Sequence, residues 1–271
     1  MLDLSLLAEA PLFSIVIGLI SVLAVAISKA GFGSAFGSLA APIMLFAFEP
    51  AIALGILLPL FLMTDVWIVW TWRHIGVRRI IIVMTICAVI GQICGWAVLR
   101  FGAMDDGLLI LFIGVMAIVT SVRYFIDMMS KNTKGLYVRQ IIRAYRKRLV
   151  SRAILWCGLS GFSSFVSLTG GIPAQIYMLP LGLPRQLFVA SMAWYFLFIN
   201  LAKLPFFTDL HFISAQSLTV SLILMPMVPI GIAIGRWLNH IMSDKLFYLT
   251  AHCLLLILGA QLVMRFVTGA S

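Results

Sequence analysis

Long apolar runs follow one another along nearly the whole chain. An α-helix needs about 20 mainly apolar residues to cross a bilayer, and six of the ten runs have that length. The pattern therefore predicts an all-α, polytopic membrane protein. Two runs, 34–48 and 172–182, are shorter and fit either short spans or the half-helices of a re-entrant hairpin. The runs lie at approximately 12–28, 34–48, 51–72, 80–99, 107–126, 153–168, 172–182, 186–206, 212–235 and 246–266.

Two glycine- and serine-rich stretches interrupt this pattern. The first break runs from Ser28 to Pro42 and holds three glycines, three serines and one lysine. The second break runs from Gly161 to Pro173. Lipid offers no partners for free N–H and C=O groups, so irregular backbone at membrane depth must line a cavity or be buried in protein. Paired interruptions at matching places in two halves indicate a transporter's binding site.

The two halves of the chain have related patterns. Pro42 and Pro173 each follow a cluster of small residues, and a shift of about 131–135 residues superimposes the runs that follow. Basic loops tend to be cytoplasmic, which places the loop 73–79 inside and the loop 208–211 outside. Matching loops on opposite sides predict inverted repeats of about five segments each, with broken or re-entrant helices that meet near the midplane. The predicted first repeat, basic connector and second repeat cover 1–127, 128–152 and 153–271.

Composition and charge favour a membrane protein over a soluble or nucleic-acid-binding one. Only 10% of the residues are charged and the mean hydropathy is +1.13, whereas a soluble domain carries roughly 25% charged residues. The formal net charge is +10, and nine of the 19 Lys and Arg residues lie between Arg123 and Arg152. This clustering follows the positive-inside rule and predicts contact with membrane lipids, not with nucleic acid. Residues 135–149 read as an amphipathic helix on the inner leaflet of the cell inner membrane, and a homodimer is left open.

The sequence holds no motif of enzymatic, metal or cofactor chemistry. It has no His-Glu-x-x-His, no Gly-x-Ser-x-Gly and no phosphate-binding glycine loop. Its four cysteines lie in apolar runs without a Cys-x-x-Cys spacing, and we interpret them as small packing residues. The alternative is a non-transporting assembly or redox factor that uses Cys87 and Cys94, which are seven residues apart.

The breaks carry the candidate binding residues. A helix that begins inside the membrane presents free N–H groups and a partial positive charge, which together favour an anion. Glycine lets the backbone approach such a ligand closely, and hydroxyl groups add donors. The alternative is that these small residues only allow close helix packing. The predicted substrate-binding residues are Lys29, Gly33, Ser34, Gly37, Ser38, Ser167, Thr169, Gly170, Gly171 and Gln175.

Three polar residues of the long spans are candidates for coupling transport to protons. Asp65 lies in the run 51–72, and it fits a proton carrier, a partner for a cation or a cap for a neighbouring helix. Asn200 and Lys203 are its counterparts in the second half, one helical turn apart. An ionisable residue at membrane depth is a functional candidate by default. For Lys29 and Lys203 the alternative is an interfacial lysine that extends to water.

At the two breaks the chain resembles the TauE/SafE family of sulfite exporters and sulfonate permeases. The resemblance rests on Gly31-Phe32-Gly33-Ser34-Ala35-Phe36-Gly37-Ser38 up to Pro42, on Thr169-Gly170-Gly171-Ile172-Pro173, and on the run from Gly231 to Arg236. It implies a secondary transporter that moves a small sulfur-containing anion, such as sulfite or an organosulfonate, across the inner membrane. We expect alternating access in the direction of export; an anion channel is the further alternative.

Overall fold

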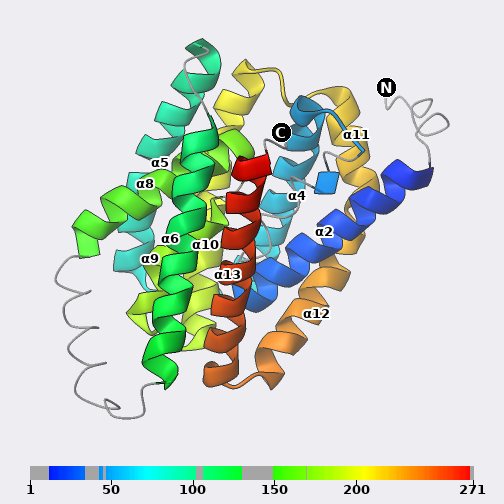
Figure 1. The fold of residues 1–271 in the computed structure, drawn as a ribbon. Coiled ribbons are helices and arrows are strands. Elements are labelled where there is room, and N and C mark those ends of the chain that lie inside the picture. The colour runs from blue at the N-terminus through cyan, green and yellow to red at the C-terminus, as the bar shows by residue number, and fades with distance from the viewer. Residues whose placement is uncertain are drawn as a thin grey trace.

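The structure is a computed structural model that describes residues 12–33, 43–44, 47–101, 106–129, 149–168 and 170–268. Helices alone make up the regular structure of these residues (Figure 1), which confirms the predicted all-α class. The predicted amphipathic helix at 135–149 falls almost wholly outside the described residues. The helices are α2 (Leu12–Phe32), α4 (Pro50–Thr71), α5 (Arg78–Phe101), α6 (Asp106–Met129), α8 (Leu149–Ser167), α9 (Gly171–Met178), the 3-10 helix η1 (Leu179–Leu181), α10 (Arg185–Asp209), α11 (Ala215–Leu224), α12 (Met227–Ile241) and α13 (Asp244–Thr268).

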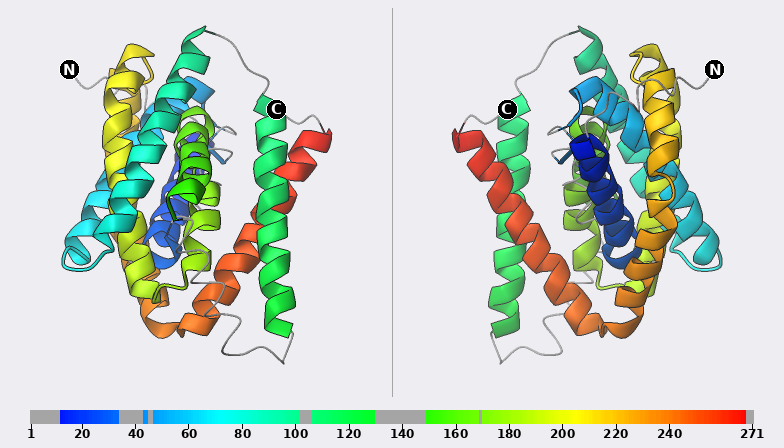
Figure 2. Two further views of the ribbon diagram at one scale, coloured as in Figure 1. Left: turned by 90° about the vertical axis from the view of Figure 1, so that its left-hand side faces the viewer. Right: turned by 90° about the vertical axis from the view of Figure 1, so that its right-hand side faces the viewer.

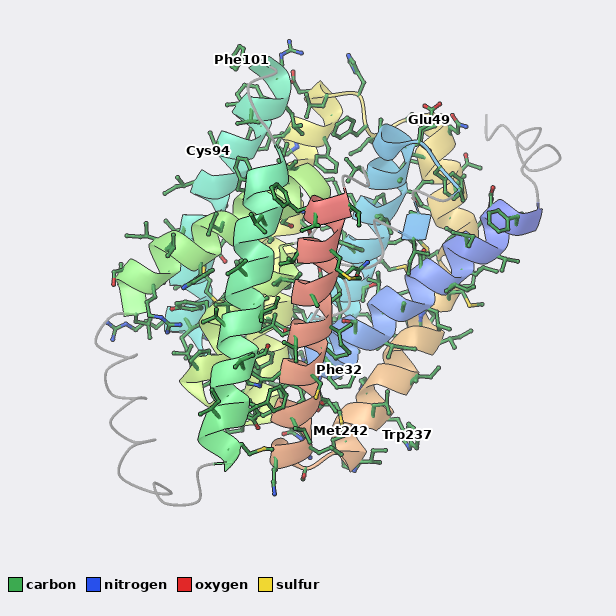
Figure 3. All side chains as sticks on the ribbon, viewed as in Figure 1. Phe32, Glu49, Cys94, Phe101, Trp237 and Met242 are labelled. Carbon is green, nitrogen blue, oxygen red and sulfur yellow. The ribbon has the colours of Figure 1, made fainter. Side chains whose placement is uncertain are left out.

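Six helices among the described residues are long and apolar enough to cross a membrane, namely α2, α4, α5, α8, α10 and α13. Large apolar side chains point outward from them, as Phe101 does from α5 in Figure 3. Trp70 is 70% exposed near the end of α4, where aromatic residues typically sit at the membrane surface. The chain is therefore a multi-pass membrane protein.

The run at 212–235 does not form the single span that its length predicts. It is divided into α11 and α12, which meet at an angle of 49° next to Pro226. Proline removes a backbone donor and its ring clashes with the preceding turn, so it bends or ends a helix. If the bent pair counts as one span, the described residues hold seven.

Close helix pairs surround two central helices. α5 packs on α8, α2 packs on α12, and α6 packs on α13, while α4 and α10 contact each other in the interior (Figure 1). α6 and α13 cross at one side of the bundle (Figure 2). Glycines make the close approach possible, because a Cβ on Gly31 would lie 3.1 Å from the carbonyl oxygen of Gly235. A Cβ on Gly114 would likewise lie 2.9 Å from the carbonyl oxygen of Gly259.

Both breaks are shorter than the sequence pattern indicates. α2 continues through Lys29 to Phe32, and α8 continues through Gly161 to Ser167, because helical hydrogen bonds satisfy the backbone of small residues as well as large ones. Each helix is followed by one residue with left-handed backbone, Gly33 at φ 65° after α2 and Leu168 at φ 56° after α8. In the view of Figure 1, α2 descends toward its break while α8 rises toward its own.

Candidate functional site

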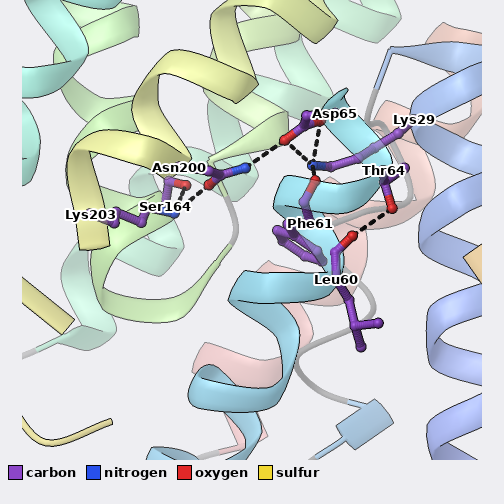
Figure 4. Close-up of polar contacts among 8 residues, drawn as sticks. All are labelled: Lys29, Leu60, Phe61, Thr64, Asp65, Ser164, Asn200 and Lys203. Carbon is purple, nitrogen blue, oxygen red and sulfur yellow. Dashed lines mark hydrogen bonds and ion pairs between the residues drawn. The ribbon is translucent and has the colours of Figure 1, made fainter. Parts of the chain in front are cut away.

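A buried ion pair joins the end of α2 to the middle of α4. The Lys29 ammonium donates to both carboxylate oxygens of Asp65, at 2.7 Å and 2.8 Å, and the two side chains are 3% and 1% exposed (Figure 4). The ammonium also lies 4.4 Å from the centre of the Phe61 ring, where a cation is attracted to the π face. The pairing alternative for Asp65 is therefore the one that the structure shows.

The second half of the chain completes this polar cluster from the opposite side. Asn200 of α10 donates its amide to Asp65 at 2.7 Å, and its amide oxygen accepts from Lys203 at 3.2 Å. Lys203 also donates to the Ser164 hydroxyl of α8 at 2.7 Å. We call these five residues, Lys29, Asp65, Ser164, Asn200 and Lys203, the central polar cluster (Figure 4).

Neither lysine of this cluster extends to water in the structure. Lys203 is fully buried and Lys29 nearly so. α2 runs obliquely beside α4 (Figure 1), and its last turn lies next to Asp65. The position of a lysine within an apolar run does not reveal its burial, because burial depends on the tilt of the helix.

The end of α2, at the first break, lies beside α9, which follows the second break. The Gln175 amide of α9 donates to the carbonyl oxygen of Phe32, the last residue of α2, at 3.1 Å. One residue earlier, the carbonyl of Gly31 accepts from Asn239 of α12 at 2.9 Å. A helix end leaves its last carbonyls without intrahelical donors, and these two amides, from α9 and α12, supply them. Gln175 is fully buried, and its own amide oxygen has no hydrogen-bond partner among the described residues.

Gly170 closes the second break with little space around it. Its carbonyl oxygen accepts from the Ser160 hydroxyl at 2.6 Å, and Ser160 in turn accepts from Tyr195 at 2.7 Å. A Cβ on Gly170 would overlap the Cβ of Ser164 and lie 2.5 Å from the Ser160 carbonyl oxygen. The glycine is therefore required by packing, whatever else it does.

The remaining predicted site residues divide into three groups. Gly33 follows α2, and Gly171 begins α9 one residue before the predicted start at Ile172. Ser167 is the last residue of α8. Ser34, Gly37, Ser38 and Thr169 lie outside the described residues.

The profile of the family described as "Sulfite exporter TauE/SafE" matches residues 17–262, nearly the whole chain. The protein belongs to the TauE/SafE family. No curated protein and no solved structure matches the chain. The family is one of membrane transporters, which agrees with the absence of an enzymatic assignment from the sequence.

The sequence analysis did not identify several residues of this candidate site. Ser164 lies inside the second break. The composition of that stretch indicates a site there, but it does not distinguish Ser164 from the neighbouring small residues. Ser160 and Tyr195 lie in apolar helices and give no signal of their own. Asn239 lies near the end of α12, where a polar residue is ordinarily solvated, yet it is 1% exposed.

Replacing Gln175 with Met is expected to reduce transport and to lower stability by about 1–3 kcal/mol, because the buried Phe32 carbonyl loses its donor. Gln92 provides a matched control. It is fully buried, donates to the Ile199 carbonyl at 2.9 Å, and also has an amide oxygen without a partner. Gln92→Met should cost similar stability in thermal unfolding while transport falls less. Equal transport in the two variants would argue against a role for Gln175 beyond packing.

Proposed function

We propose that the protein is a secondary transporter that exports sulfite or an organosulfonate by alternating access. The observation that carries the proposal is the 3.1 Å hydrogen bond from the Gln175 amide of α9 to the carbonyl oxygen of Phe32, because it links the helix that follows the second break to the helix that precedes the first. Membership of the TauE/SafE family supports the class of substrate. We propose that the anion lies between the breaks, where the first N–H groups of α9 and hydroxyl groups of the predicted binding residues would serve as donors.

The proposed contacts follow the sequence prediction. Gly170 and Gly171 lead into α9, whose first N–H groups have no intrahelical acceptor. Gln175 lies one turn later and reaches the first break. Gly33, Ser34, Gly37, Ser38, Ser167 and Thr169 complete the proposed binding set.

We further propose that the two halves are inverted repeats that exchange access to this site. The hydrogen-bonded residues Asp65 and Asn200 are 135 positions apart, and the same spacing relates Gly33 to Leu168 and the start of α4 to the start of α10. Exchanging the halves also turns the contact of α5 with α8 into that of α12 with α2. Rocking of one repeat on the other would then alternate the open side.

The proposed direction follows from charge. In a bacterial-type inner membrane the cell interior is negative, and each negative charge that leaves gains about 2.3 kcal/mol per 100 mV. Export of an anion therefore needs no coupling ion.

Reconstitution in proteoliposomes tests the proposal. We expect saturable uptake or release of labelled sulfite or of an organosulfonate, with an outward flux that increases with the membrane potential. Flux that rises linearly with concentration would indicate an anion channel instead, and absence of flux for every sulfur anion would contradict transport. Gly170→Leu is unsuitable as a site variant, because the side chain has no room beside Ser164.

The positions of Cys87 and Cys94 do not support the alternative of a redox factor. Cys87 is buried and Cys94 is exposed on α5, where its side chain points away from the bundle (Figure 3). Residues seven apart in one helix are separated by about 10 Å along the axis, which is too far for a disulfide. Replacing both with Ser is therefore expected to leave transport unchanged.

A further inference from the structure

Lys203 differs from Lys29 in the partners that it has. Its ammonium bonds to the Ser164 hydroxyl at 2.7 Å and to the Asn200 amide oxygen at 3.2 Å, and both of these groups are uncharged. Lys29 instead holds both oxygens of Asp65. Lys203 is nevertheless fully buried.

The cluster is consequently unbalanced in charge. Asn200 links Lys203 to the ion pair of Lys29 with Asp65. Its amide nitrogen donates to Asp65, and its amide oxygen accepts from Lys203. Asn200 is uncharged, and it separates the Lys203 ammonium from the Asp65 carboxylate, so no carboxylate contacts Lys203 directly among the described residues. Of the described residues in the central polar cluster, two carry an amine and one carries a carboxylate. Burying an ammonium group without a counter-charge is strongly unfavourable, and ionisable groups at membrane depth usually serve a substrate or ion pathway.

The unbalanced lysine lies next to the second break. The Ser164 hydroxyl that Lys203 contacts would be 3.0 Å from a Cβ placed on Gly170. Lys203 thus reaches the Gly-rich turn through one side chain. Lys29 lies in the first break, but its ammonium is directed at Asp65 and Phe61.

We infer that Lys203 supplies the counter-charge for the transported anion, while Lys29 and Asp65 neutralise each other and hold α2 against α4. In this role, Lys203 makes the site prefer a small oxyanion to an uncharged solute of the same shape. The inference rests on the proposed function, since it requires that an anion enters at the breaks.

The test compares a charged ligand with an uncharged one of similar shape. Binding of sulfite, methanesulfonate and dimethyl sulfone to the purified full-length chain is measured by ligand-induced thermal stabilisation. Wild type should prefer methanesulfonate to the sulfone. Lys203→Met should lower the affinity for both anions by about tenfold to a hundredfold and remove this preference. Lys203→Arg, which keeps the charge, should retain most of the preference.

Each outcome separates the inference from the proposed function. If wild type binds neither sulfite nor methanesulfonate, the proposed function itself fails. If wild type binds an anion and Lys203→Met binds it equally well, only the inference fails. Lys203→Met should also fold at least as stably as wild type, because an apolar side chain replaces a buried cation that lacks a carboxylate. A large loss of stability in that variant would show that Lys203 is structural and would overturn the inference.

Discussion

Asp65→Asn is expected to destabilise the protein by about 3–5 kcal/mol, because it leaves the Lys29 ammonium buried without a counter-charge. The change is nearly isosteric, and the new amide oxygen can still accept from Asn200, so the loss reports the charge and little else. Lys29→Met should cost a similar amount, since it strands the carboxylate instead. Unfolding in detergent micelles, followed by tryptophan fluorescence, measures both effects.

The double variant Lys29→Met with Asp65→Asn should recover most of the lost stability. Both charges are then absent, and replacing a buried ion pair with neutral side chains is often close to neutral. The double-mutant cycle gives the interaction free energy of the pair directly. A double variant that is as unstable as the sum of the two single variants would show that Lys29 and Asp65 act independently and would contradict the observed pairing.

Gly161→Ala is expected to cause the second large effect, a loss of about 3 kcal/mol or more with a shift of α8 away from α5. The new methyl group would overlap the Ala88 carbonyl group, with 2.6 Å to its carbon. Backbone cannot move aside as a flexible side chain does, so the two helices must separate.

Gly158→Ala is the matched control, in the same helix and at the same interface. A Cβ there would meet the Cys87 carbonyl oxygen at 3.8 Å, an ordinary contact. The substitution should be neutral or slightly stabilising, because alanine favours a helix by up to about 1 kcal/mol over glycine. Thermal unfolding of both variants checks the pair, and similar melting temperatures for the two would refute the packing argument.

The all-α class could be predicted from the sequence, because it depends on local composition. The long spans were predicted only in part: the described six include α2 and α8, which had been read as shorter runs, but neither 107–126 nor 212–235. Both α2 and α8 end inside the predicted breaks. The sequence also located Asp65 and Asn200 as counterparts. It could not show that these two residues bond to each other or that Lys29 joins them, because those contacts depend on how α2, α4 and α10 are rotated and tilted. The bend at Pro226 was missed for a related reason. Proline is common in membrane helices, so its presence in a long apolar run does not by itself predict an interruption.

Some candidate binding residues could be predicted from local composition, whereas others depend on contacts between helices. Gln175 was predicted from its closeness to a break, and its contact with Phe32 agrees with a position between the two halves. Ser160 and Tyr195 contribute to the same region only because α8 and α10 are adjacent there. Pairings across helices of this kind have no signature in a single sequence.

The two left-handed residues that follow α2 and α8 differ in intrinsic backbone cost. Glycine adopts positive and negative φ about equally well, so the left-handed conformation of Gly33 carries no strain of its own, although Phe188 and Met192 pack against it. Leu168 has the same left-handed conformation but carries a side chain that is 3% exposed, and neighbouring atoms hold it there. If the halves move during a transport cycle, a change of backbone conformation therefore meets less intrinsic strain at Gly33, in the amino-terminal half, than at Leu168.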